Sequence, residues 1–217
     1  MPFTDAFSSA VFSALRELDA TTDIADFKED EMCDRLLDRL RQRGDVVGGS
    51  NRKCYPGSLN KTDLVWTWRT GEIVVGEAKC HWPSWWLKHH GNLSRFVNHM
   101  GTAARDLQKL ASQSSAEASH VCLLFYGSHA VHGERHHYDL DAAYGGFASE
   151  NRLDTVVWES RTDAWPNSHG WNGYRNLIRV WICRRDRVTE WPSSPTRSRN
   201  LAKGPRTASP QSGADAS

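Results

Sequence analysis

The fold is decided by residues 63–80, which read DLVWTWRTGEIVVGEAKC. Both ends of this stretch, residues 63–68 and 73–80, are rich in the β-branched and aromatic side chains that favour strands. Between them, RTGE at residues 69–72 is typical of a tight turn. We therefore expect an antiparallel β-hairpin at the centre of the fold.

Three ionisable side chains come together in this hairpin. Glu77 and Lys79 are two residues apart and therefore point to the same face of their strand. Asp63 opens the first strand, which the turn brings beside the end of the second. Two carboxylates held about 4 Å apart repel by about 4 kcal/mol at an effective dielectric constant of about 20. A proton or a cation must therefore offset that repulsion.

A cation at this position would allow the hairpin to act on a phosphodiester. Lys79 supplies one positive charge. A Mg²⁺ ion bound by Asp63, Glu77 and a main-chain carbonyl oxygen would supply two, through the oxygen ligands that this ion prefers. Such an ion can activate a water molecule and stabilise charge on a phosphodiester. The alternative is a surface hairpin in which Glu77 and Lys79 form a salt bridge and nothing more.

Amphipathic helices are expected on both sides of the hairpin. Apolar residues recur at helical spacing over residues 3–18, from about Ile24 to Arg43, and over residues 94–112. Thr4 or Asp5 can cap the first helix, and Gly44 is expected to stop the second. The pattern predicts further strands over residues 120–127, 155–160 and 177–183. It predicts loops over residues 45–62, with a short strand at most, and over residues 163–174. Residues 81–92 are expected to be irregular or to form one short helical turn, and residues 128–150 are a His- and Gly-rich stretch with weak periodicity.

The chain has 217 residues, which suggests one domain with additions. We expect an N-terminal helix in residues 1–23, one α/β domain in residues 24–191 and a disordered tail in residues 192–217. Four basic residues and one acid give the tail a net charge of +3, which leaves −2 for the rest. Any nucleic-acid binding must therefore come from local patches rather than from a globally basic chain.

Composition excludes several classes of protein. No stretch approaches the ~20 apolar residues of a membrane-spanning helix. The N-terminus lacks the basic start and unbroken apolar run of a secretory signal. The five cysteines are odd in number, widely spread and form no CxxC pair, which argues against a disulfide scaffold and a zinc ribbon. We expect a cytoplasmic protein without a membrane partner.

The hairpin resembles the catalytic motif of a nuclease superfamily. Asp63, thirteen intervening residues and then Glu77-Ala78-Lys79 are similar to the motif of the PD-(D/E)xK nucleases, which have the restriction-endonuclease-like fold. The order helix, strand, strand with Asp, strand with Glu-x-Lys, helix, strand matches that core over about residues 24–127. Archaeal Holliday-junction resolvases and many restriction enzymes share this layout. Thr62 stands where the motif has proline, a residue that many members lack.

The resemblance implies a fold and an activity. The fold is an α/β, restriction-endonuclease-like core with a central mixed sheet flanked by helices, here with extra C-terminal strands. The activity is Mg²⁺-dependent endonucleolytic hydrolysis of DNA phosphodiester bonds, with Mn²⁺ able to substitute, in restriction and defence or in DNA repair and recombination. A homodimer would fit, because cutting both strands needs two sites or two visits.

The resemblance also implies roles for residues. The implied metal ligands are Asp63, Glu77, the carbonyl oxygen of Ala78 and, from the first core helix, Glu29. Lys79 would position and polarise the attacking water, so that Asp63, Glu77 and Lys79 form the catalytic set. Glu31 is the alternative to Glu29 as the helical ligand.

Residues outside the hairpin are candidates for nucleic-acid binding. The candidates are Lys53, Trp85, Trp86, Lys88 and Arg105. Tryptophans interleaved with basic residues can stack on splayed bases and contact phosphates. The alternative is that the tryptophans pack a helix onto the sheet and that Lys53 is ordinary loop charge. On the third helix, Arg105 or Gln108 is a candidate support for the site, against the simpler interpretation of a solvated helix face.

Two other functions fit the sequence. The first is a catalytically inactive DNA- or protein-binding module on the same fold. The second is a zinc-binding interaction protein built on the histidines of residues 129–137, which are His129, His132, His136 and His137. The spacing of His132 and His136 is typical of zinc ligands on a helix. Gly133 and the lack of a nearby cysteine favour a polar loop instead.

Overall fold

Six strands form one mixed sheet in the order β1-β2-β3-β4-β6-β5 in the computed structural model. The structure describes residues 2–21, 28–54, 61–80, 93–113, 117–130, 140–153, 158–166 and 174–190. The helices are α1 (Phe3–Asp19), α2 (Glu29–Gln42), α4 (Leu93–Gln113), α5 (Leu140–Glu150) and the 3₁₀ helix η2 (Arg185–Glu190). The strands are β1 (Val46–Cys54), β2 (Lys61–Trp68), β3 (Ile73–Cys80), β4 (His120–Ala130), β5 (Glu159–Pro166) and β6 (Tyr174–Arg184).

The sheet combines a meander with a crossover. Strands β1, β2 and β3 pair antiparallel in sequence, whereas β3 and β4 pair parallel and are joined through α4. Strand β6 pairs antiparallel with both β4 and β5. The expected α/β class, with a mixed sheet flanked by helices, is confirmed. The expected order of elements over residues 24–127 is also confirmed.

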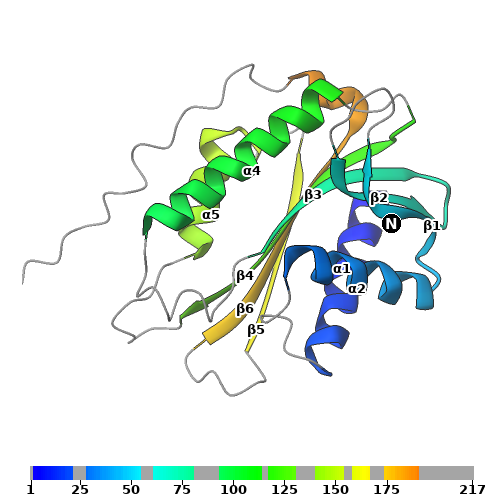
Figure 1. Cartoon of the computed structure of the whole chain (residues 1–217), viewed down its shortest axis with the longest axis horizontal. Helices are drawn as coiled ribbons and strands as arrows, with labels where there is room; N and C mark the ends of the chain where they lie inside the picture. The colour runs from blue at the N-terminus through cyan, green and yellow to red at the C-terminus, as the bar shows by residue number, and fades with distance from the viewer. Residues whose placement is uncertain are drawn as a thin grey trace, which may run out of the picture.

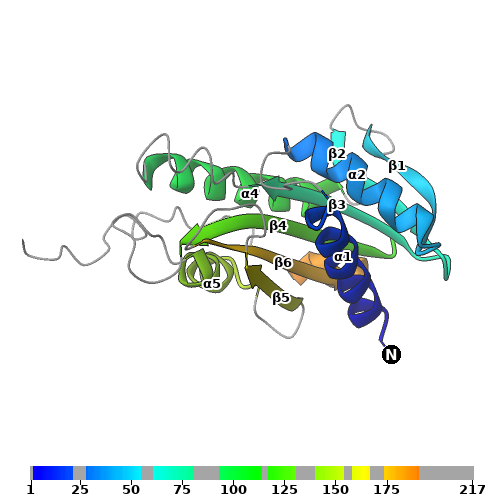
Figure 2. The same cartoon turned by 90° about the horizontal axis from the view of Figure 1, so that it is seen from below.

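Helices cover both faces of the sheet. Helices α1 and α2 lie on one face, and α4 and α5 lie on the other (Figures 1 and 2). The buried side chains accordingly form two clusters, because successive residues of a strand point to opposite faces. Val74 and Ala78 of β3 belong to the cluster under α1 and α2, while Val75 belongs to the cluster under α4 and α5.

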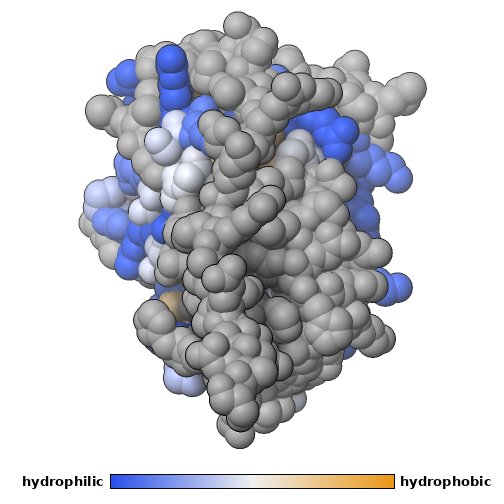
Figure 3. Space-filling model, turned by 90° about the vertical axis from the view of Figure 1, so that its left-hand side faces the viewer, coloured by the Kyte–Doolittle hydropathy of each residue, from blue (hydrophilic) through white to orange (hydrophobic). Residues whose placement is uncertain are grey.

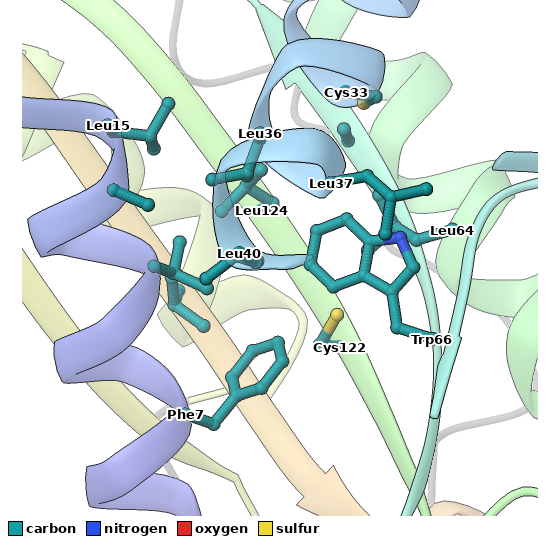
Figure 4. Packing of buried hydrophobic residues seen from close by; sticks show 14 of the residues in the cluster. Phe7, Leu15, Cys33, Leu36, Leu37, Leu40, Leu64, Trp66, Cys122 and Leu124 are labelled. Carbon is teal, nitrogen blue, oxygen red and sulfur yellow. The ribbon is translucent and has the colours of Figure 1, made fainter. Parts of the chain in front are cut away.

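The cluster under α1 and α2 is built around tryptophan. Trp66 of β2 is almost completely buried, and its ring lies between Leu37 of α2 and Cys122 of β4 (Figure 4). Its indole N–H donates to Asn51 Oδ1 at 3.0 Å, which satisfies its one polar atom. Phe7 of α1 packs against the same ring, with centroids 6.4 Å apart. This cluster anchors α1 and α2 to the sheet.

The hairpin and the end of α2 have the predicted form. Trp68 N–H donates to Glu72 O at 2.8 Å across a turn in which Gly71 has a φ of 96°. Helix α2 ends before Gly44, whose φ of 74° is the left-handed conformation that glycine adopts readily at a helix end. Both sequence predictions are confirmed. Residues 22–27, where α2 was expected to begin, lie outside the described part.

Strand β1 corrects the prediction of a short strand at most within residues 45–62. Its Gly-rich sequence has low strand propensity, yet it forms a strand of nine residues, seven of which pair with residues of β2. Gly49 has a φ of 109°, and a Cβ there would lie 2.0 Å from Val65 O. Glycine is therefore needed for the close approach of β1 to β2. The same residue that suggests a loop in the sequence permits the pairing.

Two C-terminal elements differ from the expectation. Helix α5 lies in a stretch whose weak periodicity predicts no helix, and Phe147 packs it on Phe125 and Trp181 of the sheet despite two glycines in the helix. Strand β5 runs over Glu159–Pro166, later than the expected strand at residues 155–160 and into the loop expected at residues 163–174. It is a polar edge strand, so the apolar pattern does not mark it.

The start of α1 also differs from the prediction. Neither Thr4 nor Asp5 caps the helix, because the helix begins at Phe3 and Pro2 takes the capping position without a side-chain hydrogen bond. The Thr4 hydroxyl donates to Glu159 of β5 instead. Among the described helices, none combines the length and apolar character needed to cross a membrane. The predicted tail and residues 81–92 lie outside the described part.

Candidate active site

The site lies where β2 and β3 separate. Their pairing runs from Thr67↔Ile73 to Leu64↔Gly76. Beyond this point the backbone N–H of Ala78 donates to Asp63 Oδ2 at 2.9 Å, and the Thr62 hydroxyl donates to Gly76 O at 2.6 Å. Side chains of β2 thus replace the strand-to-strand hydrogen bonds. The Asp63 carboxylate is held against the backbone of β3.

Helix α4 supplies two partners to β3. Glu77 and Lys79 point towards α4, and their side chains are only 3% and 7% exposed. Lys79 Nζ lies 2.8 Å from Asp106 Oδ2, and Lys109 Nζ lies 3.0 Å from Glu77 Oε1. Asp106 and Lys109 also pair with each other at 3.5 Å. Glu77 and Lys79 are two residues apart on β3, and their partners Lys109 and Asp106 are three residues apart on α4, so both pairs form at once.

The Lys79 ammonium lies among oxygen atoms from several elements. Nζ is 2.7 Å from Ala78 O, 3.4 Å from Glu29 Oε1 and 3.7 Å from Asp63 Oδ2. Glu29 is the first residue of α2, and its other oxygen accepts from Cys80 N–H at 3.3 Å. Strand β2, strand β3 and helix α2 therefore direct oxygen atoms at one positively charged group.

Ion pairs fix the first turn of α2 beside the site. Arg52 of β1 contacts Asp34 Oδ2 at 2.5 Å and Asp30 Oδ2 at 3.2 Å. Asn51 also donates to Asp34, at 2.8 Å. These contacts tie β1 to the turn of helix that begins with Glu29. The end of β1 therefore contributes to the position of Glu29 in the site.

Burial shapes the protonation of the site. Burial, with the nearby Asp63 carboxylate second, raises the pKa of Glu77 to about 9. Burial also raises the pKa of Glu29. Burial acts to lower the pKa of Lys79, but Glu29, Asp106 and Asp63 outweigh it and raise that pKa. At neutral pH Glu77 therefore holds a proton and Lys79 is charged.

The predicted central residues meet in the structure. Asp63, Glu77, Lys79, the Ala78 carbonyl oxygen and Glu29 all lie at this point. Glu31, the alternative to Glu29, does not: it is exposed and pairs with Arg35 at 3.1 Å. The alternative of a plain Glu77–Lys79 salt bridge is wrong, because each of these two side chains pairs with a residue of α4 instead.

Two residues of α4 that complete the site were not predicted from the sequence. The predicted candidates on this helix are Arg105 and Gln108, whereas the side chains in contact with β3 are Asp106 and Lys109. Arg105 is exposed and donates to Thr102 Oγ1 at 3.1 Å. The available signal was an acid and a base three residues apart on a helix that follows a Glu-x-Lys strand.

Several other predicted residues lie outside the described part of the chain. These are Trp85, Trp86, Lys88, the side chain of Lys53, and the side chains of His129, His132, His136 and His137. Of the predicted nucleic-acid-binding residues, only Arg105 has a described side chain. The thiols of Cys33 and Cys80 are buried near the site, and burial raises their pKa well above the ordinary value. Neither is a ready nucleophile.

The oxygen atoms of the site are held by lysines. Four carboxyl groups, those of Glu29, Asp63, Glu77 and Asp106, share two ammonium groups, those of Lys79 and Lys109. Over the described ranges, no group of three His, Cys, Asp or Glu side chains is arranged as a ready metal site. Comparison of the chain with protein-family models, with curated proteins and with solved structures gave no match.

Proposed function

We propose that this protein is a Mg²⁺-dependent endonuclease that hydrolyses DNA phosphodiester bonds on a restriction-endonuclease-like core. The observation that carries the proposal is the convergence of Asp63, Glu29 and the Ala78 carbonyl oxygen on one cation, the Lys79 ammonium. A buried second carboxyl group, Glu77, lies beside them. Buried carboxyl groups are costly, so their gathering at the end of a hairpin favours a functional role over a structural one.

The donor set fits a hard divalent cation. Every candidate ligand is an oxygen atom, and a carbonyl together with carboxylates suits Mg²⁺ or Mn²⁺. The Lys79 ammonium acts as a stand-in, because it shows that a positive charge is stable among these oxygens. Asp63, Glu29, Glu77 and Ala78 O would hold the ion. Once bound, the ion would activate a water molecule and stabilise charge on the phosphate.

The residues of the chain have distinct roles in this proposal. Asp63 is oriented by the Ala78 N–H, which donates to the same Oδ2 atom that lies near the Lys79 ammonium. Glu77 holds a proton at neutral pH, which it would give up to solvent in order to serve as a metal ligand. Lys79 keeps a positive charge next to the reacting phosphate, where it polarises the attacking water and offsets developing negative charge.

The topology supports the same core. The order α2, β1, β2, β3, α4 and β4, with an antiparallel meander followed by a parallel β3–β4 pair, is the order expected for that fold. Asp63 lies on the middle strand of the meander, and Glu77 and Lys79 lie on the next. Strands β5 and β6 extend the sheet beyond this core. A role in restriction and defence or in repair and recombination, and action as a homodimer, belong to the proposal.

A cleavage assay tests the proposed function. Supercoiled plasmid, linear duplex, branched DNA, single-stranded DNA and RNA are incubated with the protein and Mg²⁺, Mn²⁺ or EDTA. We expect metal-dependent cutting of DNA that Lys79→Ala abolishes. Lys61→Ala, which removes an exposed lysine of β2, is the matched control and should retain cutting. Circular dichroism verifies that each variant is folded.

The outcomes separate the enzyme from its alternative. Cutting by Lys79→Ala at the wild-type rate would overturn the mechanism. If folded wild-type protein cuts no substrate but binds DNA, the chain is instead a binding module on the same fold. The substrate that is cut fastest distinguishes restriction of duplex DNA from resolution of branched DNA.

A further inference from the structure

The Lys79 ammonium and the proposed metal ion need the same oxygen atoms. Nζ contacts Ala78 O, Glu29 Oε1 and Asp63 Oδ2, and all three belong to the proposed ligand set. Its fourth contact is Asp106 Oδ2 at 2.8 Å, on α4. A divalent cation and the ammonium cannot both lie among the first three oxygens, because like charges in a partly buried site repel strongly. Binding of the cation therefore requires the ammonium to move.

Asp106 is built to receive a lysine. Its Oδ2 contacts Lys79 and its Oδ1 lies 3.5 Å from Lys109, so the carboxylate bridges the two ammonium groups. Lys109 is in turn held by Glu77 at 3.0 Å. The Asp106 side chain is only 17% exposed, which strengthens its hydrogen bonds relative to those of a surface pair. Both oxygens are therefore engaged by lysines rather than directed at the ligand set.

We propose that Asp106 is a positioning residue, which holds the Lys79 ammonium beside the site while a divalent cation occupies the oxygens of Glu29, Asp63 and Ala78. This inference rests on the proposed function. Asp106 keeps the positive charge of Lys79 within the site, yet off the oxygens that the metal needs. Without the Asp106 charge, the ammonium stays among those oxygens and competes with the ion.

Metal binding by Asp106 variants tests this role directly. Mn²⁺ binding is measured by electron paramagnetic resonance and by calorimetry, with no DNA present. We expect Asp106→Asn to raise the dissociation constant about tenfold, because an amide attracts the ammonium far less than a carboxylate does. Asp106→Glu should restore most of the affinity. Asp38→Asn removes an exposed acid of α2 and controls for the loss of one charge anywhere.

A double-mutant cycle separates this role from a direct one. If Asp106 acts through Lys79, then Asp106→Asn changes Mn²⁺ affinity in the wild type but not in a Lys79→Met background. If Asp106 is itself a ligand or acts through its field alone, the tenfold loss persists in Lys79→Met. Persistence of the loss, or no loss in Asp106→Asn with Lys79 present, would overturn the inference.

The design keeps the two proposals distinguishable. A wild-type protein that neither binds Mn²⁺ nor cuts DNA overturns the proposed function and this inference together. A wild-type protein that binds Mn²⁺ and cuts DNA, with an Asp106 effect independent of Lys79, overturns only the inference. Thermal unfolding in EDTA verifies that the variants are folded. If Asp106→Asn is not folded, Asp106→Ser, which also removes the charge, is used in the same cycle.

Discussion

The two faces of the β2–β3 hairpin are made by alternate residues of the same strands, yet only the face towards α4 combines apolar packing, by Val65, Ile73 and Val75, with an ionic network. Towards α1 and α2, Leu64, Trp66 and Val74 join a closely packed apolar cluster. Towards α4, Asp63 and Glu77 lie in a network of carboxylates and lysines. Outside this network, the described residues visible on the side of the molecule in Figure 3 are mostly hydrophilic or neutral in hydropathy. One strand pair thus contributes to the apolar core and to a buried ionic network.

The difference between the faces gives separate expectations for stability and for the proposed activity. Burial of an apolar side chain stabilises a fold by about 1.5–3 kcal/mol. Burial of charged groups costs free energy that their ion pairs only partly return. On face α1–α2 the hairpin contributes apolar packing, whereas on face α4 it contributes both the packing of Val75 and the costly ionic network. Substitutions on the two faces should accordingly have opposite signatures.

Trp66 and Asp63 give the largest contrast, because both lie on β2. Trp66→Ala empties the centre of the apolar cluster and should lower the free energy of unfolding by about 3–5 kcal/mol. Asp63→Asn keeps an oxygen that can accept from Ala78 N–H, so stability should change by less than about 1 kcal/mol. Its cleavage rate should fall at least ~10³-fold, about 4 kcal/mol in activation free energy.

Urea unfolding and the cleavage assay measure both halves of this contrast. Trp66→Phe retains an aromatic ring and controls for the loss of the side chain as a whole. A large loss of stability in Asp63→Asn would mean that the network on face α4 holds the fold together. The division between the two faces would then be wrong.

The sequence predicts this division well wherever local pattern decides it. Alternation along the hairpin puts Glu77 and Lys79 on one face, and the turn brings Asp63 beside them. Asp106 and Lys109 were not predicted, because their role depends on which face of α4 packs on the sheet. That choice is made by contacts between residues about 30 positions apart, such as Glu77 with Lys109. Single-sequence periodicity carries no such information.

The close approach of the β1 and β2 backbones could not be predicted from the sequence either. Gly49 looks like a loop residue, yet it is the residue that lets β1 approach β2. Glu29 could be placed in the site only by resemblance, since its contact with Lys79 spans 50 positions in the sequence. Residues whose role rests on tertiary contacts therefore form the part of the site that the sequence leaves open.

The protonation of Glu77 gives a second prediction, which concerns how the stability of the protein depends on pH. Its pKa of about 9 in the folded protein lies above its unfolded value of 4.5. The stabilising contribution of its proton is therefore complete below pH 4.5 and is lost as the pH rises towards 9. The loss is at most ~1.4 kcal/mol per pH unit, or ~3 kcal/mol between pH 6 and 8.

Glu77→Gln tests this sign, because glutamine is neutral at every pH. Urea unfolding in EDTA measures the free energy of unfolding of both proteins. As the pH rises from 6 to 8, we expect that of the wild type to fall relative to that of Glu77→Gln. A simple ion pair between Glu77 and Lys109 predicts no such change, because Glu77 would then be ionised in both the folded and the unfolded protein from pH 6 to 8. A stability difference between wild type and variant that stays constant from pH 6 to 8 would show that Glu77 is charged and that burial does not dominate.

Gly76 gives the smallest of the three effects and tests how closely the two faces are joined. A Cβ at this position would lie 2.3 Å from Cys122 Sγ and 2.7 Å from Leu64 Cδ1, within the cluster under α1 and α2. Gly76→Ala should therefore destabilise the protein by about 1–3 kcal/mol through overpacking. Gly101→Ala on α4 is the matched control: its Cβ meets nothing within 4 Å, and alanine should stabilise the helix by up to about 1 kcal/mol.

The Gly76 variant can also be rescued in part. Adding Cys122→Ala removes the sulfur atom that the new methyl group meets, but Cys122 O remains 2.9 Å from the Cβ. We therefore expect the double variant to recover some of the loss measured by thermal unfolding. Gly76 directly precedes Glu77, which lies on the other face. The cleavage rate of Gly76→Ala therefore reports whether strain on the α1–α2 face alters the site on the α4 face. Unchanged cleavage by a destabilised Gly76→Ala would show that the two faces respond independently, whereas a matching loss of activity would show that packing on one face sets the geometry of the other.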